Sequence, residues 1–151
     1  MPSDDIRTAD PRTTARPSAE VMSGVIPYLD MNGRAAEAAD FYARAFGAKD
    51  LGRMADPQRP GRHMHVQIEI NGGALMMSDG MSADERPGPA GLHLQLVVED
   101  GHAWWKRAVE AGCDIVYPYE KQFWGDWWGL LKDPLGVQWG VLESGPEQPS
   151  A

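Results

Sequence analysis

Histidine and carboxylate side chains recur at alternate positions in the middle of this chain. His63, His65 and Glu69 are spaced so that they would share one face of a β-strand, and His93 opens a second stretch of the same kind. Imidazole and carboxylate groups on neighbouring strands can converge on one divalent ion. These four residues are therefore the candidate metal ligands, although a pair of histidines on a solvated strand face is the commoner arrangement.

Amides and tryptophans form a second group of candidates, suited to hydrogen bonding and stacking against an organic molecule. Tryptophans clustered around a turn would form either an aromatic wall for a flat or cationic ligand or a contact between subunits, and the sequence leaves both open. The candidate ligand-binding residues are His93, Gln67, Glu69, Gln95, Trp124, Trp127, Trp128 and Gln138.

Several classes of function are disfavoured by composition. The net charge of −8 opposes binding to nucleic acid. The single cysteine, Cys113, leaves no intrachain disulfide. No apolar run is long enough to span a bilayer, and the first residues lack a signal-peptide core, so we expect a cytoplasmic protein without a membrane partner. No Ser-His-Asp set, phosphate-binding loop or dinucleotide fingerprint is present, and no catalytic residue is assigned.

The pattern of elements repeats once along the chain. Residues 25–31, 50–54, 63–70 and 74–78 read as strands around a helix at 34–46, which Asp30 or Asn32 could cap and Gly47 would end. Residues 92–98, 114–119, 127–132 and 137–142 read as strands around a helix at 102–111, with Asp100 as its cap and Gly112 at its end. The interval from Pro27 to His93 nearly equals that from Gly47 to Gly112, which favours a duplicated β-α-β-β-β unit.

This organisation predicts one α+β domain over residues 24–143, with half-modules at about 24–80 and 91–143. The polar segments 1–23 and 144–151 are expected to be disordered tails. Apolar strand faces would pack under the two helices, and the mixed faces would line the concave side of a curved mixed sheet.

Six short segments of the chain have a recognisable order and spacing: residues 26–29, 41–42, 45–47, 72–79, 123–126 and 133–139. In these segments the chain resembles the PhnB-like branch of the vicinal-oxygen-chelate superfamily, which includes glyoxalases, bleomycin-resistance proteins and dioxygenases. The resemblance implies paired modules around a ligand cavity, a homodimer and, in the metalloenzymes, up to four metal ligands.

Most of the metal-ligand positions implied by the resemblance are altered in this chain. The first falls on Pro27, the second near Met76 or Met77, the third on His93 and the last on Gly140. Only His93 can bind a hard cation through its side chain. The chain is therefore expected to hold no metal or other cofactor tightly.

The resulting expectation is a homodimeric protein that binds a small organic molecule, aromatic or cationic, between its modules. Two alternatives stay open. One is a metal-dependent lyase, isomerase or dioxygenase that uses the His63, His65, Glu69 and His93 set. The other is a protein–protein interaction module whose cavity is filled by side chains.

Overall fold

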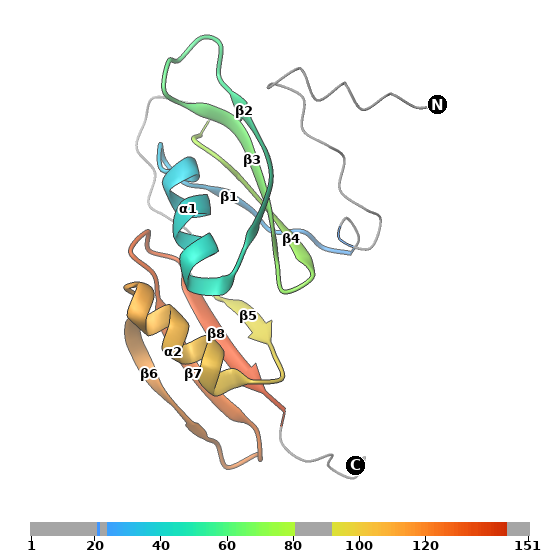
Figure 1. Cartoon of the computed structure of the whole chain (residues 1–151), viewed down its shortest axis with the longest axis vertical. Helices are drawn as coiled ribbons and strands as arrows, with labels where there is room; N and C mark the ends of the chain where they lie inside the picture. The colour runs from blue at the N-terminus through green and yellow to red at the C-terminus, as the bar shows by residue number, and fades with distance from the viewer. Residues whose placement is uncertain (1–20, 22–23, 81–91, 145–151) are drawn as a thin grey trace.

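A computed structural model describes residues 21, 24–80 and 92–144, and it contains two modules placed end to end (Figure 1). The tails expected at 1–23 and 144–151 lie almost entirely outside these residues. Within the described ranges, no helix has the length and apolar character required to cross a membrane.

The first module contains one helix and a four-stranded sheet. Strand β1 pairs in parallel with β4, and the other neighbouring strands are antiparallel. The sheet order is β1-β4-β3-β2. The elements in chain order are β1 (Tyr28–Asp30), α1 (Ala35–Phe46), β2 (Lys49–Ala55), β3 (His63–Ile70) and β4 (Gly73–Ser78).

The second module repeats this topology, with sheet order β5-β8-β7-β6 and a parallel β5–β8 pair. Its elements are β5 (Leu94–Val97), α2 (Gly101–Ala111), β6 (Asp114–Lys121), β7 (Trp127–Lys132) and β8 (Gln138–Glu143). The predicted duplication is confirmed. The predicted α+β fold is also confirmed, and each half-module contributes a four-stranded mixed sheet of its own.

A carboxylate from the end of the last strand holds the start of each helix. Asp79 Oδ1 accepts a hydrogen bond from the Ala35 backbone N at 2.8 Å, and Glu143 Oε1 accepts one from the Gly101 N at 2.7 Å. Both bonds satisfy backbone donors that a helix leaves open and place negative charge at the positive end of its dipole. The two modules therefore use the same device at equivalent points.

Three of the four predictions for the caps and ends of the helices are confirmed. Gly47 ends α1 in the left-handed region at φ 68°, Gly112 follows α2, and Asp100 caps α2 by accepting from Ala103 N. The predicted capping of α1 by Asp30 or Asn32 is wrong. Asp30 accepts from Asn32 N instead, and the distant Asp79 takes the capping role.

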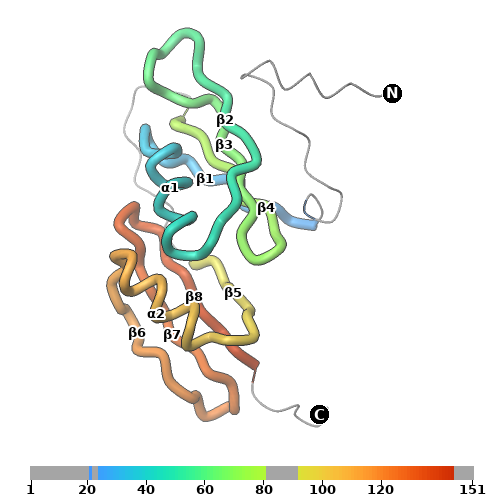
Figure 2. The backbone as a smooth tube through the Cα atoms, in the orientation of Figure 1, coloured from blue at the N-terminus to red at the C-terminus, as the bar shows by residue number. Residues whose placement is uncertain are grey.

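Helices α1 and α2 lie side by side and join the two modules (Figure 2). Arg107 of α2 donates to the carbonyl oxygens of Ala43 and Arg44 in the last turn of α1, and Ala43 O also accepts from the Gly47 backbone N. Beneath the helices, the Trp139 ring of β8 packs at centroid distances of 5.1 Å from Tyr42 and 4.6 Å from Phe46. The modules thus share one aromatic core.

A buried carboxylate lies at the centre of this junction. Asp133 Oδ2 accepts from the Tyr42 hydroxyl at 2.7 Å and from Trp139 Nε1 at 2.8 Å, while Oδ1 accepts from the backbone N of Leu135 and Val137. Burial, together with the Asp133 carboxylate, raises the pKa of Tyr42 far above the ordinary tyrosine value. Tyr42 therefore remains a hydrogen-bond donor.

The apolar face of β3 forms part of the core except at its first position. Val66, Ile68 and Ile70 are buried as expected, whereas Met64 is 48% exposed. On the opposite face Gln67 is 6% exposed, so that face is not uniformly solvated. The polar side chains that could bind a ligand lie on this second face.

We expect Asp133→Asn to lower the free energy of unfolding by about 3 kcal/mol, because an amide cannot accept from the two backbone N–H groups and from Tyr42 and Trp139 together. Denaturant titration measures the loss. Asp114→Asn, which alters an exposed carboxylate, should change stability by less than about 0.5 kcal/mol. Equal stability of the two variants would contradict the role assigned to Asp133.

Candidate functional site

Three of the predicted ligand-binding residues meet on the face of the second sheet that is turned away from α2. Gln95 Oε1 accepts from Trp128 Nε1 at 3.1 Å, and His93 Nε2 lies 3.1 Å from the same oxygen. The indole N–H can only donate, which identifies this atom of Gln95 as the carbonyl oxygen and makes His93 Nε2 the second donor. We call His93, Gln95 and Trp128 the polar–aromatic cluster.

The cluster exists because residue 140 has no side chain. Gly140 lies opposite Gln95 in the register of β5 and β8. A Cβ atom at this position would overlap Gln95 Oε1 and approach Trp128 Nε1 to 2.9 Å. The resemblance implies a metal-binding carboxylate here, and in this chain the space is taken by hydrogen-bonded Gln95 and Trp128.

Tyr117 of β6 and Leu130 of β7 extend the cluster into an aromatic surface. The Tyr117 ring lies 6.1 Å from Trp128 at an interplanar angle of 35°, and Leu130 is buried beside it. Tyr117 itself is 57% exposed. An indole and a phenol ring held on one sheet face offer a platform for a flat apolar group.

The first sheet presents a different set on its own outer face. The Tyr28 hydroxyl lies 2.9 Å from His65 Nδ1, and His65 Nε2 lies 2.9 Å from Gln67 Oε1. Glu69, on the same strand, is 3.5 Å from the Lys49 ammonium. Tyr28 is not among the site residues predicted from the sequence, and its hydroxyl nevertheless contacts His65. Its alternation with the buried Leu29 was the available signal.

The strand register corrects one correspondence between the modules. Tyr28 pairs with Met76, as Gln95 pairs with Gly140, so Tyr28 is the counterpart of Gln95. Pairing Pro27 with His93 is therefore wrong by one residue. The hydrogen-bond ladder fixes this alignment, which sequence spacing alone approximates.

The other predicted wall residues lie apart from the cluster. Trp127, also predicted to line the ligand, has its ring on the α2 side, stacked on Tyr119 at 5.7 Å and edge-on to His102 at 4.7 Å. Trp124 lies in the β6–β7 turn against Phe123. Gln138 shares the outer face but pairs with Lys132, at the opposite end of β8 from Trp128's partner Leu142.

The candidate metal ligands are not brought together. His65 uses both ring nitrogens in hydrogen bonds, Glu69 faces Lys49, and His93 belongs to the other module. In the ranges 24–80 and 92–144, no three His, Cys, Asp or Glu side chains are placed to hold one ion. The predicted set His63, His65, Glu69 and His93 thus does not form a site in one chain.

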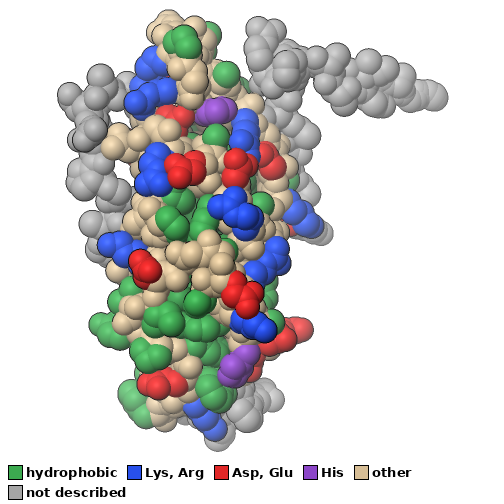
Figure 3. Space-filling view, turned by 60° about the vertical axis from the view of Figure 1, so that its left-hand side comes forward, with side chains coloured by type: hydrophobic (Ala, Val, Ile, Leu, Met, Phe, Trp, Pro, Cys, Tyr) green, Lys and Arg blue, Asp and Glu red, His purple; other side chains and the backbone are tan. Residues whose placement is uncertain are grey.

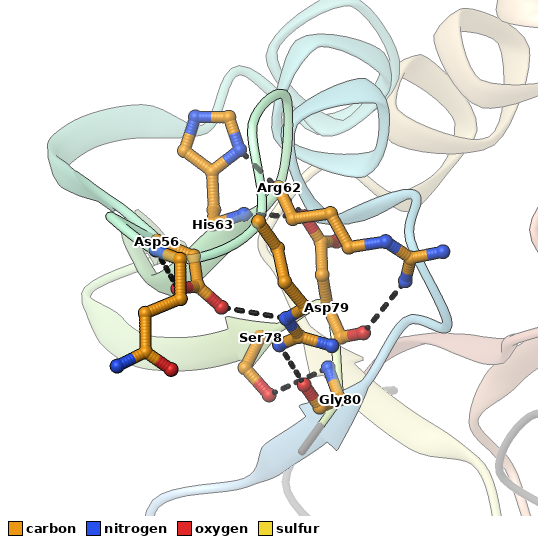
Figure 4. Close-up of polar contacts among 8 residues, drawn as sticks. Asp56, Arg62, His63, Ser78, Asp79 and Gly80 are labelled. Carbon is orange, nitrogen blue, oxygen red and sulfur yellow. Dashed lines mark hydrogen bonds and ion pairs between the residues drawn. The ribbon is translucent and has the colours of Figure 1, made fainter. Parts of the chain in front are cut away.

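His63 lies at the start of β3, among arginine and aspartate side chains that are bonded to one another (Figure 4). Its Nδ1 is 3.7 Å from Asp79 Oδ2, which already accepts from the His63 backbone N. Arg62 donates to the Asp79 carbonyl oxygen, and Arg59 pairs with Asp56 at 2.6 Å. The Asp79 carboxylate near His63 is therefore engaged in holding the backbone of His63 and of Ala35.

Hollows of two kinds lie near the junction of the modules. One of about 200 Å³ lies between them and reaches the cluster through Gln95; it is lined by Pro27, Ile70, Gly73, Ala74, Leu75, Leu94, Gln95, Leu96 and Trp139. Another of about 780 Å³ lies near the start of α2, where Glu99, Asp100 and Trp104 contribute to its walls. Only the smaller hollow contains a predicted site residue.

The family is decided by comparison with known proteins. The model of the Glyoxalase/Bleomycin resistance protein/Dioxygenase superfamily matches residues 31–141. The chain belongs to this superfamily. The fold expected from the resemblance is therefore confirmed, with its two β-α-β-β-β modules.

Individual relatives agree with this assignment. An uncharacterized protein of Mycobacterium bovis is 36% identical over 115 residues, which cover 71% of this chain and 74% of that protein. The crystal structure of protein PA1353 from Pseudomonas aeruginosa has a TM-score of 0.69 at 27% identity and covers 81% of this chain and 98% of that chain. The PhnB protein from Bacillus cereus has a TM-score of 0.68, covers 81% of this chain and 100% of that chain, and at 18% identity shows the shared fold alone.

We expect Gly140→Ala to lower the free energy of unfolding by about 1 to 3 kcal/mol, because the new methyl group displaces Gln95 and breaks its bonds to Trp128 and His93. The measurement is a double-mutant cycle with Gln95→Ala, in which the cost of Gly140→Ala should largely disappear. Gly73→Ala is the matched control, since a Cβ there meets only the Ile70 carbonyl oxygen at 3.8 Å. Additive costs in the cycle would refute the steric account of Gly140.

Proposed function

We propose that the protein binds a small aromatic molecule on the outer face of the second sheet, without a tightly held metal. The observation that carries this proposal is the polar–aromatic cluster over Gly140, where Gln95, His93 and Trp128 occupy the space of a metal-binding carboxylate. Membership of the superfamily supports the binding of a small molecule in general.

The hydrogen bonds within the cluster define what the ligand should offer. Gln95 Oε1 already accepts from two donors, so its amide nitrogen is the group left to donate toward a ligand. The Trp128 and Tyr117 rings supply stacking surface beside it. An aromatic compound that carries a carbonyl or ether oxygen fits this arrangement.

The surroundings favour a neutral or cationic ligand over an anionic one. The chain carries a net charge of −8, and an indole face attracts cations. The hollow between the modules, at about 200 Å³, is smaller than a typical binding site of about 300 to 1,000 Å³. It would therefore hold one end of the ligand while the ring rests on Trp128.

Apolar side chains gather over the second module on the face shown in Figure 3, whereas charged side chains dominate over the first. Ile115, Val116 and Trp124 of the β6–β7 hairpin are among the exposed large apolar residues. A surface of this kind suits the predicted homodimer as well as a ligand. Tests of binding therefore need a record of oligomeric state.

For a compound selected by thermal shift from a panel of aromatic carbonyl compounds, Trp128→Ala should weaken binding tenfold or more, because loss of stacking and of the Gln95 hydrogen bond removes about 1.4 kcal/mol or more. Trp124→Ala is the matched control, and its affinity should stay within about twofold of the parent. Calorimetry gives the affinities, and light scattering on the same samples reports the oligomeric state. Binding by Trp128→Ala as tight as by the parent would refute the proposed site.

The purified protein is expected to contain much less than one metal ion per chain, and removal of divalent ions by a chelator should leave its melting temperature unchanged. The reason is that Gly140 supplies no ligand and that His65 and Glu69 are engaged elsewhere. Elemental analysis after dialysis measures this. One Zn, Ni, Mn or Fe per chain that survives dialysis would instead favour the metal-dependent alternative.

A further inference from the structure

The first sheet carries a chain of hydrogen bonds that the proposed ligand site does not use. It runs from the Tyr28 hydroxyl to His65 Nδ1 and from His65 Nε2 to Gln67 Oε1, with both distances 2.9 Å. The Tyr28 and His65 rings are 5.6 Å apart. We call these three residues the Tyr28 chain.

The acceptor at one end fixes the direction of the protons. Gln67 Oε1 is a carbonyl oxygen, so His65 Nε2 carries the proton of a neutral imidazole and donates it. His65 Nδ1 then has a free lone pair, and the Tyr28 hydroxyl donates to it. A hydroxyl is therefore held against a base, and the base is oriented by a third group.

The two ends of the Tyr28 chain differ sharply in burial. Gln67 is 6% exposed and is fixed within β3, whereas Tyr28 is 52% exposed on the edge strand β1. The orienting end is therefore anchored in the module, and the tyrosine at the other end is half exposed to solvent. This is the arrangement needed for a nucleophile that an outside molecule must reach.

The fold itself does not require these side chains. The register makes Gln95, Trp128 and Leu130 the counterparts of Tyr28, His65 and Gln67 in the second module. That sheet forms with an amide, an indole and an aliphatic side chain at the equivalent positions, and with no hydroxyl or imidazole there. The Tyr28 chain is thus a feature of one module beyond the needs of the scaffold.

We propose that Tyr28, His65 and Gln67 form a metal-independent nucleophile, base and orienting group that accept an acyl group from an activated ester. In the step, Tyr28 Oη forms a bond to the ester carbonyl carbon while its proton passes to His65 Nδ1. The bond from that carbon to the leaving oxygen breaks, and the imidazolium proton goes to the leaving group or to solvent. Gln67 Oε1 keeps its bond to Nε2–H throughout and stabilises the imidazolium.

Ionisation of Tyr28 ahead of the reaction is not needed. Burial raises the pKa of Tyr28, partly offset by a hydrogen bond with Ser78, so the residue rests as a neutral phenol. Proton removal must then accompany bond formation, and His65 is the group in position to receive the proton. A tyrosine without such a base lacks this advantage.

Tyr117 provides an internal comparison, because it is 57% exposed against 52% for Tyr28, and no hydrogen bond of its hydroxyl occurs among residues 24–80 and 92–144. The full chain is treated with 4-nitrophenyl acetate, release of nitrophenolate is followed by absorbance, and acetyl groups are mapped by peptide mass spectrometry. Tyr28 should be acetylated at least about tenfold faster than Tyr117.

Variants separate base assistance from simple exposure. His65→Asn should reduce the acetylation rate of Tyr28 to that of Tyr117. His63→Asn alters a histidine of the same strand that is not part of the Tyr28 chain, so Tyr28 should still be acetylated faster than Tyr117. Circular dichroism confirms that each variant is folded. If Tyr28 in the unaltered protein reacts no faster than Tyr117, or if its excess survives in folded His65→Asn, the proposal is overturned. Trp128 takes no part in this reaction, so the outcome leaves the proposed ligand site to be judged separately.

Discussion

The buried Asp133 carboxylate joins the two modules of this protein. It closes the turn between β7 and β8 through the backbone N–H groups of Leu135 and Val137, and it binds Tyr42 of the first module and Trp139 of the second. A buried carboxylate is tolerated only when its oxygens are satisfied, and here four donors satisfy them. The aromatic core shared by α1 and β8, and with it the relative placement of the two sheets, depends on these bonds.

The helix-facing sides of both sheets form this core. The side chains that could bind or react with another molecule therefore lie on the outer faces. The two outer faces are built on equivalent backbone positions but carry different side chains. Tyr28 and Met76 face each other in the first sheet, as Gln95 and Gly140 do in the second. The first sheet carries the Tyr28 chain, in which the tyrosine is half exposed. The second sheet carries an aromatic platform above Gly140. Duplication of the backbone has therefore not duplicated the site.

The comparison with known proteins establishes a scaffold, and the residues of this chain determine its chemistry. The superfamily model spans most of the described domain, and the solved structures share its module order. Yet three of the four positions that the resemblance assigns to metal ligands hold Pro27, Met76 or Met77, and Gly140, which leaves His93 alone. Gly140 is the reason that Gln95 and Trp128 meet. The same fold thus carries side chains of a different chemical type at these positions.

The sequence by itself determined the elements of this protein. Alternation of apolar residues located β3, β5 and β8, glycines located the ends of α1 and α2, and the repeated interval indicated two modules, because these signals act over a few residues. The tertiary structure alone decided the long-range features: the capping of α1 by Asp79, the face taken by Trp127, the separation into two sheets, and the meeting of Tyr28 with His65. Each of these depends on strand register or on packing between segments far apart in the chain, and a shift of one residue, as between Pro27 and Tyr28, turns a side chain to the opposite face.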